Sequence, residues 1–300
     1  MYRTVLKIIL LGFLVCPLPL FAQHLEYGNI STSNLENEDG SKVGKGGVQY
    51  VSGSYTLPIS TQIDSLHRIR SWSATFTGKY ASFDDKECTK PINPDDIINA
   101  GVMLTHVRTI APRWNIIATT GASLSAMADY IRINSVALTA GAIFLYKVNN
   151  ALNVGAGMVV TTAYGEPVCI PLPFITWKKN GKFCYELNMQ GRPEFIISTQ
   201  LNPKVRLTFS PFEAQAFSAV VKKDGENRVY INSLFKATLG GSCQLTKKLS
   251  MKADAGIIYY HKVKVTERSF KSFWKNMFGS DGAYTYKPSF ALCIGMNYSL

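Results

Sequence analysis

Charged side chains recur at alternate positions inside stretches that are otherwise apolar or small. They share one face of each stretch, and the apolar residues occupy the other face. If these faces line a common cavity, their amines, guanidinium groups and carboxylates attract ions of opposite charge. A cavity lined by more cations than anions attracts anions. The candidate lumen-lining residues are Glu186, Arg206, Lys236, Lys252, Asp254, Lys262 and Lys287.

The alternative interpretation is that several of these charges lie at strand ends, where they contact lipid headgroups or water. It applies at least as well to Lys147, Lys204 and Lys264, which share the same phase but stand near turns or loops. Lys236 and Lys252 lie within long stretches and are the strongest lumen candidates.

The four histidines are the natural candidates for acid–base chemistry: His24, His67, His106 and His261. An outer-membrane lipid hydrolase pairs a histidine with a serine and orients it with a third polar group. None of the four stands in such a motif. His261 is predicted to lie at a membrane interface, and His106 in the lumen or at an interface. We therefore predict no catalytic residues, and a lipid-modifying enzyme with a different site remains the third interpretation.

The acidic stretch from Asp84 to Asp96 offers the hard oxygen ligands that calcium prefers. Its spacing matches no calcium-binding loop, and the sequence has no glycine-rich phosphate loop. No cysteine pair has the spacing of a zinc site. We predict a solvated loop here, with no metal site and no cofactor.

A short amphipathic segment stands between Ser269 and Gly279, and its lysines fall away from its apolar positions. The apolar positions follow helical spacing and are Phe270, Phe273, Trp274, Met277 and Phe278. Gly279 suits the end of a helix. The predicted helix falls in what should be the last extracellular loop of a barrel, where it either lies on a lipid surface or plugs the barrel mouth. An ordinary loop with aromatic side chains packed on a rim is the remaining interpretation.

The elements that must position all these residues are β-strands. From Tyr284 to Leu300, apolar or aromatic residues alternate with small or polar ones, which is the two-residue period of a strand. Several other predicted strands have roughly twelve residues or more, whereas strands of soluble proteins usually have about five or six. Short turns also alternate with longer loops. These features predict an all-β fold, an antiparallel transmembrane barrel of about 12–14 strands.

The turns of this barrel are marked by local signals. Asn149-Asn150, Asn180-Gly181 and Asn202-Pro203 separate pairs of predicted strands. Residues 58–70 are predicted to be a polar connection. A change of phase near Pro211 predicts a β-bulge.

The N-terminal residues 1–22 resemble a secretory signal, with Arg3 and Lys7 before a short apolar run and Ala22 at its end. Residues 23–300 then form one barrel domain. The net charge of +12 suits anionic headgroups or solutes better than nucleic acid, which an exported chain rarely meets. Cys88 and Cys169 fall in predicted loops on one side, and either a bridge or free thiols is consistent with their positions.

Two stretches carry a family resemblance, IAPRWNIIATTGASLS (residues 110–125) and LNVGAGMVVTTAYGEPVCIPLPFITWK (residues 152–178). With the spacing of the later hairpins, the chain resembles an uncharacterised family of outer-membrane β-barrels from gram-negative bacteria, carried as a domain of unknown function. The resemblance implies an outer-membrane barrel and supplies no catalytic residues. The C-terminal strand also resembles the signal read by the barrel-assembly machinery, with Tyr298 as its aromatic, although the chain ends on Leu300 instead of phenylalanine.

The functional interpretation that follows is a passive channel or small-solute transporter of the outer membrane with a weakly anion-attracting lumen. A closed barrel with a structural or surface-interaction role in the envelope is the alternative. The expected partners are outer-membrane lipids, lipopolysaccharide and the barrel-assembly machinery.

Overall fold

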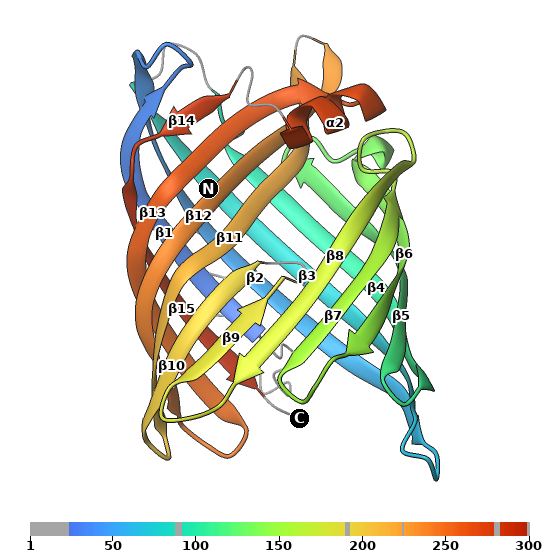
Figure 1. The fold of residues 1–300 in the computed structure, drawn as a ribbon. Helices are drawn as coiled ribbons and strands as arrows, with labels where there is room; N and C mark the ends of the chain where they lie inside the picture. The colour runs from blue at the N-terminus through green and yellow to red at the C-terminus, as the bar shows by residue number, and fades with distance from the viewer. Residues whose placement is uncertain (1–23, 88–91, 190–192, 224, 279–282, 299–300) are drawn as a thin grey trace.

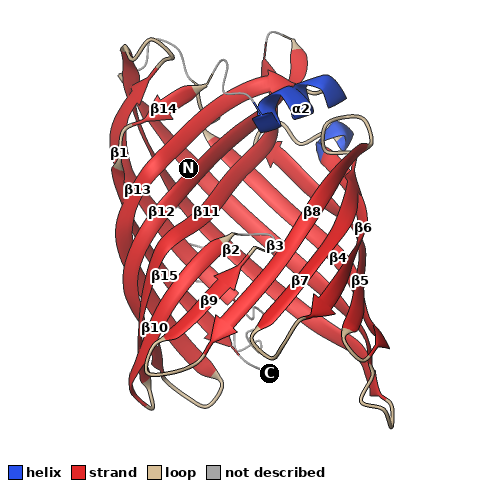
Figure 2. Ribbon diagram, in the orientation of Figure 1, coloured by secondary structure: helices blue, strands red, loops and turns tan. Residues whose placement is uncertain are grey.

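The computed structural model describes residues 24–87, 92–189, 193–223, 225–278 and 283–298, and these form one continuous β-sheet (Figure 1). The predicted signal segment 1–22 lies outside the described residues. Figure 2 shows that strands make up almost all of the described part of the fold, with helix α2 and a short 3-10 turn at the upper end. Within the described residues, no helix combines the length and apolar character needed to cross a membrane.

The strands follow one another along the chain with few interruptions. The first seven strands are β1 (His24–Glu36), β2 (Lys42–Ile63), β3 (Ile69–Lys86), β4 (Asp96–Ala111), β5 (Trp114–Met127), β6 (Val136–Lys147) and β7 (Leu152–Thr161). The others are β8 (Val168–Lys179), β9 (Cys184–Asn188), β10 (Glu194–Asn202), β11 (Val205–Lys223), β12 (Glu226–Gln244), β13 (Leu249–Glu267), β14 (Tyr284–Tyr286) and β15 (Ser289–Tyr298). The short turn η1 spans Ile133–Ser135, and the helix α2 spans Phe270–Phe278.

The sheet closes on itself as a barrel. From β1 to β13 each strand pairs antiparallel with its neighbour in the chain. β14 and β15 each pair with both β13 and β1. β14 and β15 thus share one position in the wall, and the barrel has fourteen strand positions. The predicted antiparallel barrel of 12–14 strands is confirmed.

Asparagines close several turns at the lower end, where the described C-terminus also lies. Asn149 Oδ1 accepts hydrogen bonds from the backbone N–H groups of Ala151 and Leu152, at 2.8 and 2.9 Å. Asn202 Oδ1 accepts in the same way from the two residues after Pro203, both at 2.9 Å. These side chains replace backbone acceptors in the tight turns, as their positions in the sequence predict.

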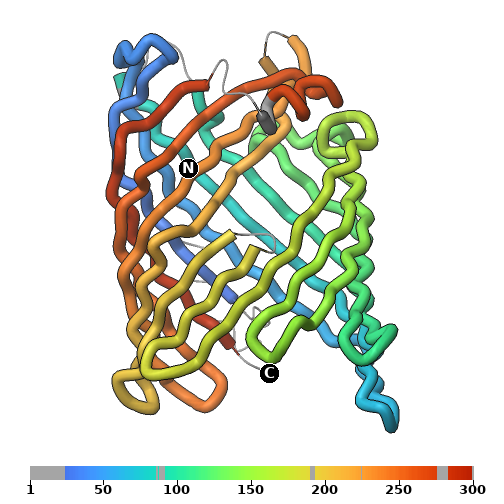
Figure 3. Tube along the Cα trace, in the orientation of Figure 1, coloured from blue at the N-terminus to red at the C-terminus, as the bar shows by residue number. Residues whose placement is uncertain are grey.

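The prediction of a polar connection over residues 58–70 is wrong. β2 continues to Ile63 and β3 begins at Ile69, and the two form a long hairpin that projects beyond the lower end (Figure 3). The turn lies at Asp64, whose Oδ1 accepts from the backbone N–H groups of Leu66 and Arg68, both at 2.9 Å. The polar residues are strand residues here because the hairpin extends past the barrel, where both of its faces are exposed.

Three irregularities change which residues face inward. The register shift between Ser210 and Glu213 in β11 confirms the predicted phase change near Pro211. A bulge in β13 leaves Tyr259 without a cross-strand partner on β12, so the inward phase passes from Ile258 to His261. The C-terminal strand is interrupted between β14 and β15, so the inward phase passes from Tyr286 to Ser289.

The upper part of the barrel is narrower than the lower part. Near the end of β5, Ala126 pairs in parallel with Val220 of β11, and this pairing excludes β6–β10. The upper ring therefore contains nine strands: β1–β5, β11–β13 and β14. β9 and β10 lie only in the lower half of the wall (Figure 1).

The upper ring is filled by its own side chains. Every residue of the buried apolar cluster comes from the strands of this ring or from β15, and none comes from β6–β10. The cluster consists of Ile30, Leu35, Val48, Tyr50, Ala81, Phe83, Ile97, Phe217, Ala219, Val221, Tyr230, Leu234, Ile258, Val263, Tyr286, Ala291 and Cys293. An apolar core therefore fills the lumen of the upper half.

The outer face of the barrel is apolar between its two ends. Leu138, Met158, Leu239, Ile257 and Phe290 are exposed there. Near the lower end, outward aromatic rings pair across neighbouring strands: Trp72 with His106 at 4.3 Å, Trp114 with Tyr146 at 4.9 Å, and Trp177 with Tyr185 at 6.4 Å between centroids. An apolar band edged by aromatic residues is the exterior of a membrane barrel.

Candidate functional site

A layer of charged side chains lies beneath the apolar core. Glu213 on β11 and Lys236 on β12 form an ion pair with 3.1 Å between Nζ and Oε1, and their side chains are only 7 and 4 % exposed. The bulge after Ser210 turns Glu213 inward, opposite Lys236. Two charges in such a dry place cost free energy to desolvate, and their attraction offsets this cost only with good geometry.

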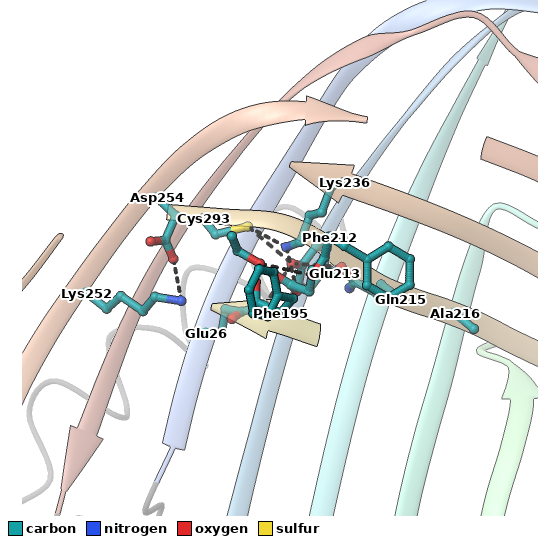
Figure 4. Close-up of polar contacts among 12 residues, drawn as sticks. Glu26, Phe195, Phe212, Glu213, Gln215, Ala216, Lys236, Lys252, Asp254 and Cys293 are labelled. Carbon is teal, nitrogen blue, oxygen red and sulfur yellow. Dashed lines mark hydrogen bonds and ion pairs between the residues drawn. The ribbon is translucent and has the colours of Figure 1, made fainter. Parts of the chain in front are cut away.

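The ion pair belongs to a larger polar cluster (Figure 4). The Tyr50 hydroxyl donates to Glu26 Oε1 at 2.8 Å and lies 3.4 Å from Cys293 Sγ. Lys236 Nζ donates to the same sulfur at 3.4 Å. Two carboxylates, one amine, one phenol and one thiol from five strands thus meet at the base of the core.

A second ion pair lies lower on the same side of the lumen. Lys252 Nζ is 2.7 Å from Asp254 Oδ2, and the carboxylate is almost fully buried. Gly240 faces this carboxylate from β12. A Cβ atom at Gly240 would collide with the Asp254 carboxylate and the Ala253 carbonyl, so the absence of a side chain makes room for the buried charge.

Further charges lie at the lower end of the lumen. Glu186 forms an ion pair with Lys178 of β8, and Arg206 Nε donates to Gln200 Oε1 at 3.4 Å. Arg206 is exposed and shares the inward phase of buried Ser210. These groups are hydrated, unlike the layer beneath the core.

Two predicted lumen lysines lie elsewhere. Lys262 alternates with buried His261 and Val263, so it points to the outer face, where its Nζ lies 5.5 Å from the centre of the Tyr260 ring. The bulge at Tyr259 produces this reversal.

Lys287 stands between β14 and β15, is exposed, and forms an ion pair with Glu36 at 3.0 Å. The interruption of the C-terminal strand produces this position.

The structure also adds site residues that the sequence did not single out. Glu26 and Glu213 place carboxylates against the predicted lysine layer, and Cys293 contributes its thiol. The alternation around Glu26 in the first strand was the signal for an inward carboxylate. No such signal marks Glu213 in the sequence, because the bulge before it changes which alternate residues face inward.

The prediction that His261 lies at a membrane interface is wrong. His261 is 2 % exposed, its ring stacks on Tyr286 at 4.3 Å, and its Nε2 donates to Asn232 Oδ1 at 2.9 Å. Asn232 in turn donates to the Tyr230 hydroxyl at 3.0 Å. The histidine therefore belongs to a polar network inside the upper core.

A loop residue completes this network. Asn93, in the connection between β3 and β4, accepts from the Tyr230 hydroxyl and donates to that of Tyr286, both at 2.7 Å. Asp85 accepts from the backbone N–H groups of Ile92 and Asn93 at 3.1 and 3.0 Å. Asn93 is thereby fastened into the upper mouth of the barrel.

The acidic stretch is engaged in local contacts. Glu87 forms ion pairs with Lys42 and Lys45 at 3.0 and 2.8 Å. Hydrogen bonds from Lys45 and Lys42 lower the pKa of the Glu87 carboxyl below its usual value. Among the described residues, no group of three or more histidine, cysteine or acidic side chains could hold a metal ion. Cys169 is free, and Cys88 lies outside the described residues.

Helix α2 lies on the upper rim, between the tops of β11–β13 and β6–β8 (Figure 2). Phe273 is buried against Tyr164 at 4.8 Å and Trp274 at 5.4 Å, whereas Phe270 is exposed. Arg268 Nε, just before the helix, donates to the Ala163 carbonyl at 3.2 Å. The side chains of Met277 and Phe278 lie outside the description. The helix therefore fastens the end of β13 to the loop between β7 and β8.

Several solved structures share a coarse likeness with this chain. The NanC porin has 8 % identity, covers 92 % of this chain and 100 % of its own, and gives a TM-score of 0.34. The toluene transporter TodX of Pseudomonas putida has 8 % identity, 91 and 88 % coverage, and a TM-score of 0.32. The translocator domain of the autotransporter NalP from Neisseria meningitidis has 10 % identity, 100 and 95 % coverage, and a TM-score of 0.31. Scores at this level transfer no function to this chain.

A search of curated proteins gives no match. The model of one protein family, described as a domain of unknown function (DUF6268), matches residues 19–299, which include every strand described above. The chain therefore belongs to the DUF6268 family of β-barrel proteins.

Proposed function

We propose that this chain is an outer-membrane transporter of small solutes, with a lumen that is wide at the lower end and closed above by the apolar core. The observation that carries this proposal is the charged layer of Lys236, Glu213 and Glu26 at the point where the ring narrows. Ionisable groups inside a membrane protein are expensive and usually mark a path for substrates or ions. A barrel with only a structural role gains little from them.

The charges also suggest what the lumen attracts. Lys236 and Lys252 each have a carboxylate partner and Glu26 adds a third carboxylate, so these residues leave no positive surplus. Arg206 and Lys178 at the lower mouth leave a modest positive surplus beside Glu186. We propose a weak preference for anions at the lower mouth and none at the charged layer.

The setting in the cell is part of the proposal. The apolar band and its aromatic edge support residence in an outer membrane, with lipids and lipopolysaccharide around the barrel. Exposed Phe290, Leu292 and Ile294 on β15 support recognition of the C-terminal strand by the barrel-assembly machinery.

Single-channel recording of the refolded mature chain in a planar bilayer tests the transport proposal. We expect brief, small currents from the wild type, because the core closes the upper ring. Asn93→Ala removes the amide that holds the loop to Tyr230 and Tyr286, and it should lengthen the open periods. Asn153→Ala is the matched control, because Asn153 bonds only to Thr176 in the lower wall.

A closed barrel with an envelope role is the second candidate, and the filled upper ring favours it. If neither the wild type nor Asn93→Ala conducts current, in barrels shown to be folded, the closed barrel is the correct candidate. A large steady current from the wild type would instead show that the core does not close the lumen.

A further inference from the structure

One edge of β8 has no strand partner over most of its length. β9 pairs with β8 only from Thr176 to Lys179, and the last hydrogen bond on this edge runs from Met189 N–H to the Ile175 carbonyl at 3.0 Å. Above Ile175, the residues from Val168 to Phe174 pair with β7 on the other edge and, within the described chain, with no strand on this edge.

Prolines occupy this free edge. Backbone groups point alternately to the two edges of a strand, and the Ile175 carbonyl points to the free one. Pro173 and Pro171 therefore turn their nitrogen atoms to the same edge, where neither has an N–H group. An unpaired N–H facing lipid costs several kcal/mol, and prolines also block the addition of another strand. The sequence thus suits an edge that has no strand partner within the described chain.

The facing strand, β11, turns away from β8 at the same height. Its pairing with β10 ends at Glu213, and the last hydrogen bond along the wall runs from the Ala214 N–H to the Pro193 carbonyl at 2.8 Å. Above this point, the Ala216 carbonyl accepts from Lys79 Nζ at 3.1 Å, and the Ser218 carbonyl accepts from Asn99 Nδ2 at 2.8 Å. Lys79 and Asn99 are register partners on β3 and β4, so β11 is satisfied across the lumen and not along the wall. We call the interval between residues 168–174 of β8 and 214–218 of β11 the lateral gap (Figure 1).

The surface on the β8 side of the lateral gap is uncharged. The only charged residues of β6–β8 are Lys147, Lys178 and Lys179, all at the lower ends of their strands. The inward residues of these strands include Ile143, Gly155, Gly157, Val159, Ile170, Leu172 and Phe174. Outward Pro171 and Pro173 are exposed, as are Ala216 and Ser218 on the facing strand. An apolar surface therefore runs from the outside of β8 around its free edge to the inside.

The lateral gap has a frame above and below. The contact between Phe273 of α2 and Tyr164 spans its upper end, and the bond from Arg268 to the Ala163 carbonyl reinforces it. The hairpin of β9 and β10 forms its lower border. These fixed borders hold β8 and β11 apart.

We propose that the lateral gap is a portal in the barrel wall through which the hydrocarbon chain of a single-chain membrane amphiphile enters the lumen. This inference rests on the proposed transport function and names its substrate class. The apolar edge of β8 and the uncharged inner faces of β6–β8 accommodate the hydrocarbon chain. An added strand is a poor occupant, because the prolines offer it no donors.

Photolabelling tests the portal. The refolded mature chain in phosphatidylcholine vesicles is irradiated with a diazirine-bearing palmitate, and the labelled residues are located by mass spectrometry. We expect label on inner-wall Ile170 and Leu172, which are half-buried, as well as on outer-wall Met158. Ala216→Trp fills the gap with a large ring and should lower the inner-to-outer ratio by roughly fivefold or more. Ala140→Trp adds the same ring to an exposed outward position on β6 and should leave the ratio unchanged.

Two results would overturn the portal. One is label confined to the outer wall of a folded wild-type barrel, and the other is inner-wall label that Ala216→Trp does not reduce, since the probe would then enter through the lower mouth. Ser218→Trp adds the same ring at the next exposed position of β11 and replaces Ala216→Trp if that variant does not fold. The transport proposal is tested by single-channel currents and the portal by photolabelling. Failure of the portal therefore does not overturn the transport proposal.

Discussion

Val220 on β11 pairs in parallel with Ala126 on β5, and this one bridge reduces a ring of fourteen strands to a ring of nine. Three features of the molecule follow from it. The smaller ring is narrow enough to be filled by its own side chains, β6–β8 are left outside this ring, and β8 keeps an unpaired edge. The core, the charged layer below it and the lateral gap are therefore parts of one arrangement.

The buried ion pair gives the first prediction. Lys236→Met or Glu213→Leu alone leaves one buried charge without its ion-pair partner, and each should lower the free energy of unfolding by about 3–5 kcal/mol. The double variant should recover most of this loss, because two apolar groups replace two desolvated charges. Urea unfolding in vesicles measures all three, and additive losses would show that the two side chains do not act as a pair.

Neighbouring glycines on β12 give a matched pair of variants. Gly240→Ala places a methyl group against the Asp254 carboxylate and the Ala253 carbonyl, whereas the nearest atom to a Cβ at Gly241 lies at 3.4 Å. We expect Gly240→Ala to destabilise the barrel by about 1–3 kcal/mol, as overpacking does, and Gly241→Ala to be nearly neutral. Equal melting temperatures for the two variants would contradict the tight approach at Asp254.

Ion selectivity distinguishes a charge inside the lower mouth, Arg206, from a charge on the outer face, Lys262. Arg206→Gln removes an inward, hydrated charge and should shift the reversal potential under a salt gradient away from anions. Lys262→Gln removes the same charge from the outer face beside Tyr260 and should leave the reversal potential unchanged. The opposite pattern would mean that Lys262 lines the lumen and Arg206 does not.

The projecting β2–β3 hairpin should respond to acid. A hydrogen bond from the Arg68 backbone N–H lowers the pKa of Asp64 below its usual 3.8. Hydrogen bonds from the Arg68 side chain and from the Leu66 backbone N–H lower this pKa further. A lowered pKa means that the ionised carboxylate stabilises the turn above pH 3.8 and that this contribution is lost as the pH falls below it. The protection of the Leu66 and Arg68 amides from hydrogen exchange, relative to their intrinsic rates at each pH, should therefore fall below pH 3.8 in the wild type. Asp64→Asn should remove this pH dependence.

The sequence predicts the barrel because its strands keep a two-residue period over lengths that soluble strands rarely reach. It also predicts the inward positions of Lys236, Lys252 and Asp254, which lie in regular stretches. It fails for Lys262 and His261, because one extra residue at Tyr259 reverses the phase and a bulge of this kind has no strong local signal.

The sequence also does not predict that the upper ring narrows to nine strands and is filled by side chains. The pairing of Val220 with Ala126 joins residues that are far apart in the chain, and neither strand differs locally from its neighbours. The prolines of β8 were the available signal for the unpaired edge. Alternating prolines do not occur in the middle of a fully paired wall, since each removes a ladder hydrogen bond.

Those prolines give the last prediction. Pro171→Thr with Pro173→Thr restores two N–H groups to an edge that has no acceptor strand, so each exposed donor should cost about 1–3 kcal/mol. The alternative for the variant is to pair with another chain, because it lacks the proline block. We expect a lower free energy of unfolding in vesicles or a crosslinkable dimer. Leu172→Thr is the control, because the backbone N–H of Leu172 points to β7, and it should stay monomeric. A double variant as stable and as monomeric as the wild type would show that β8 has a partner on this edge.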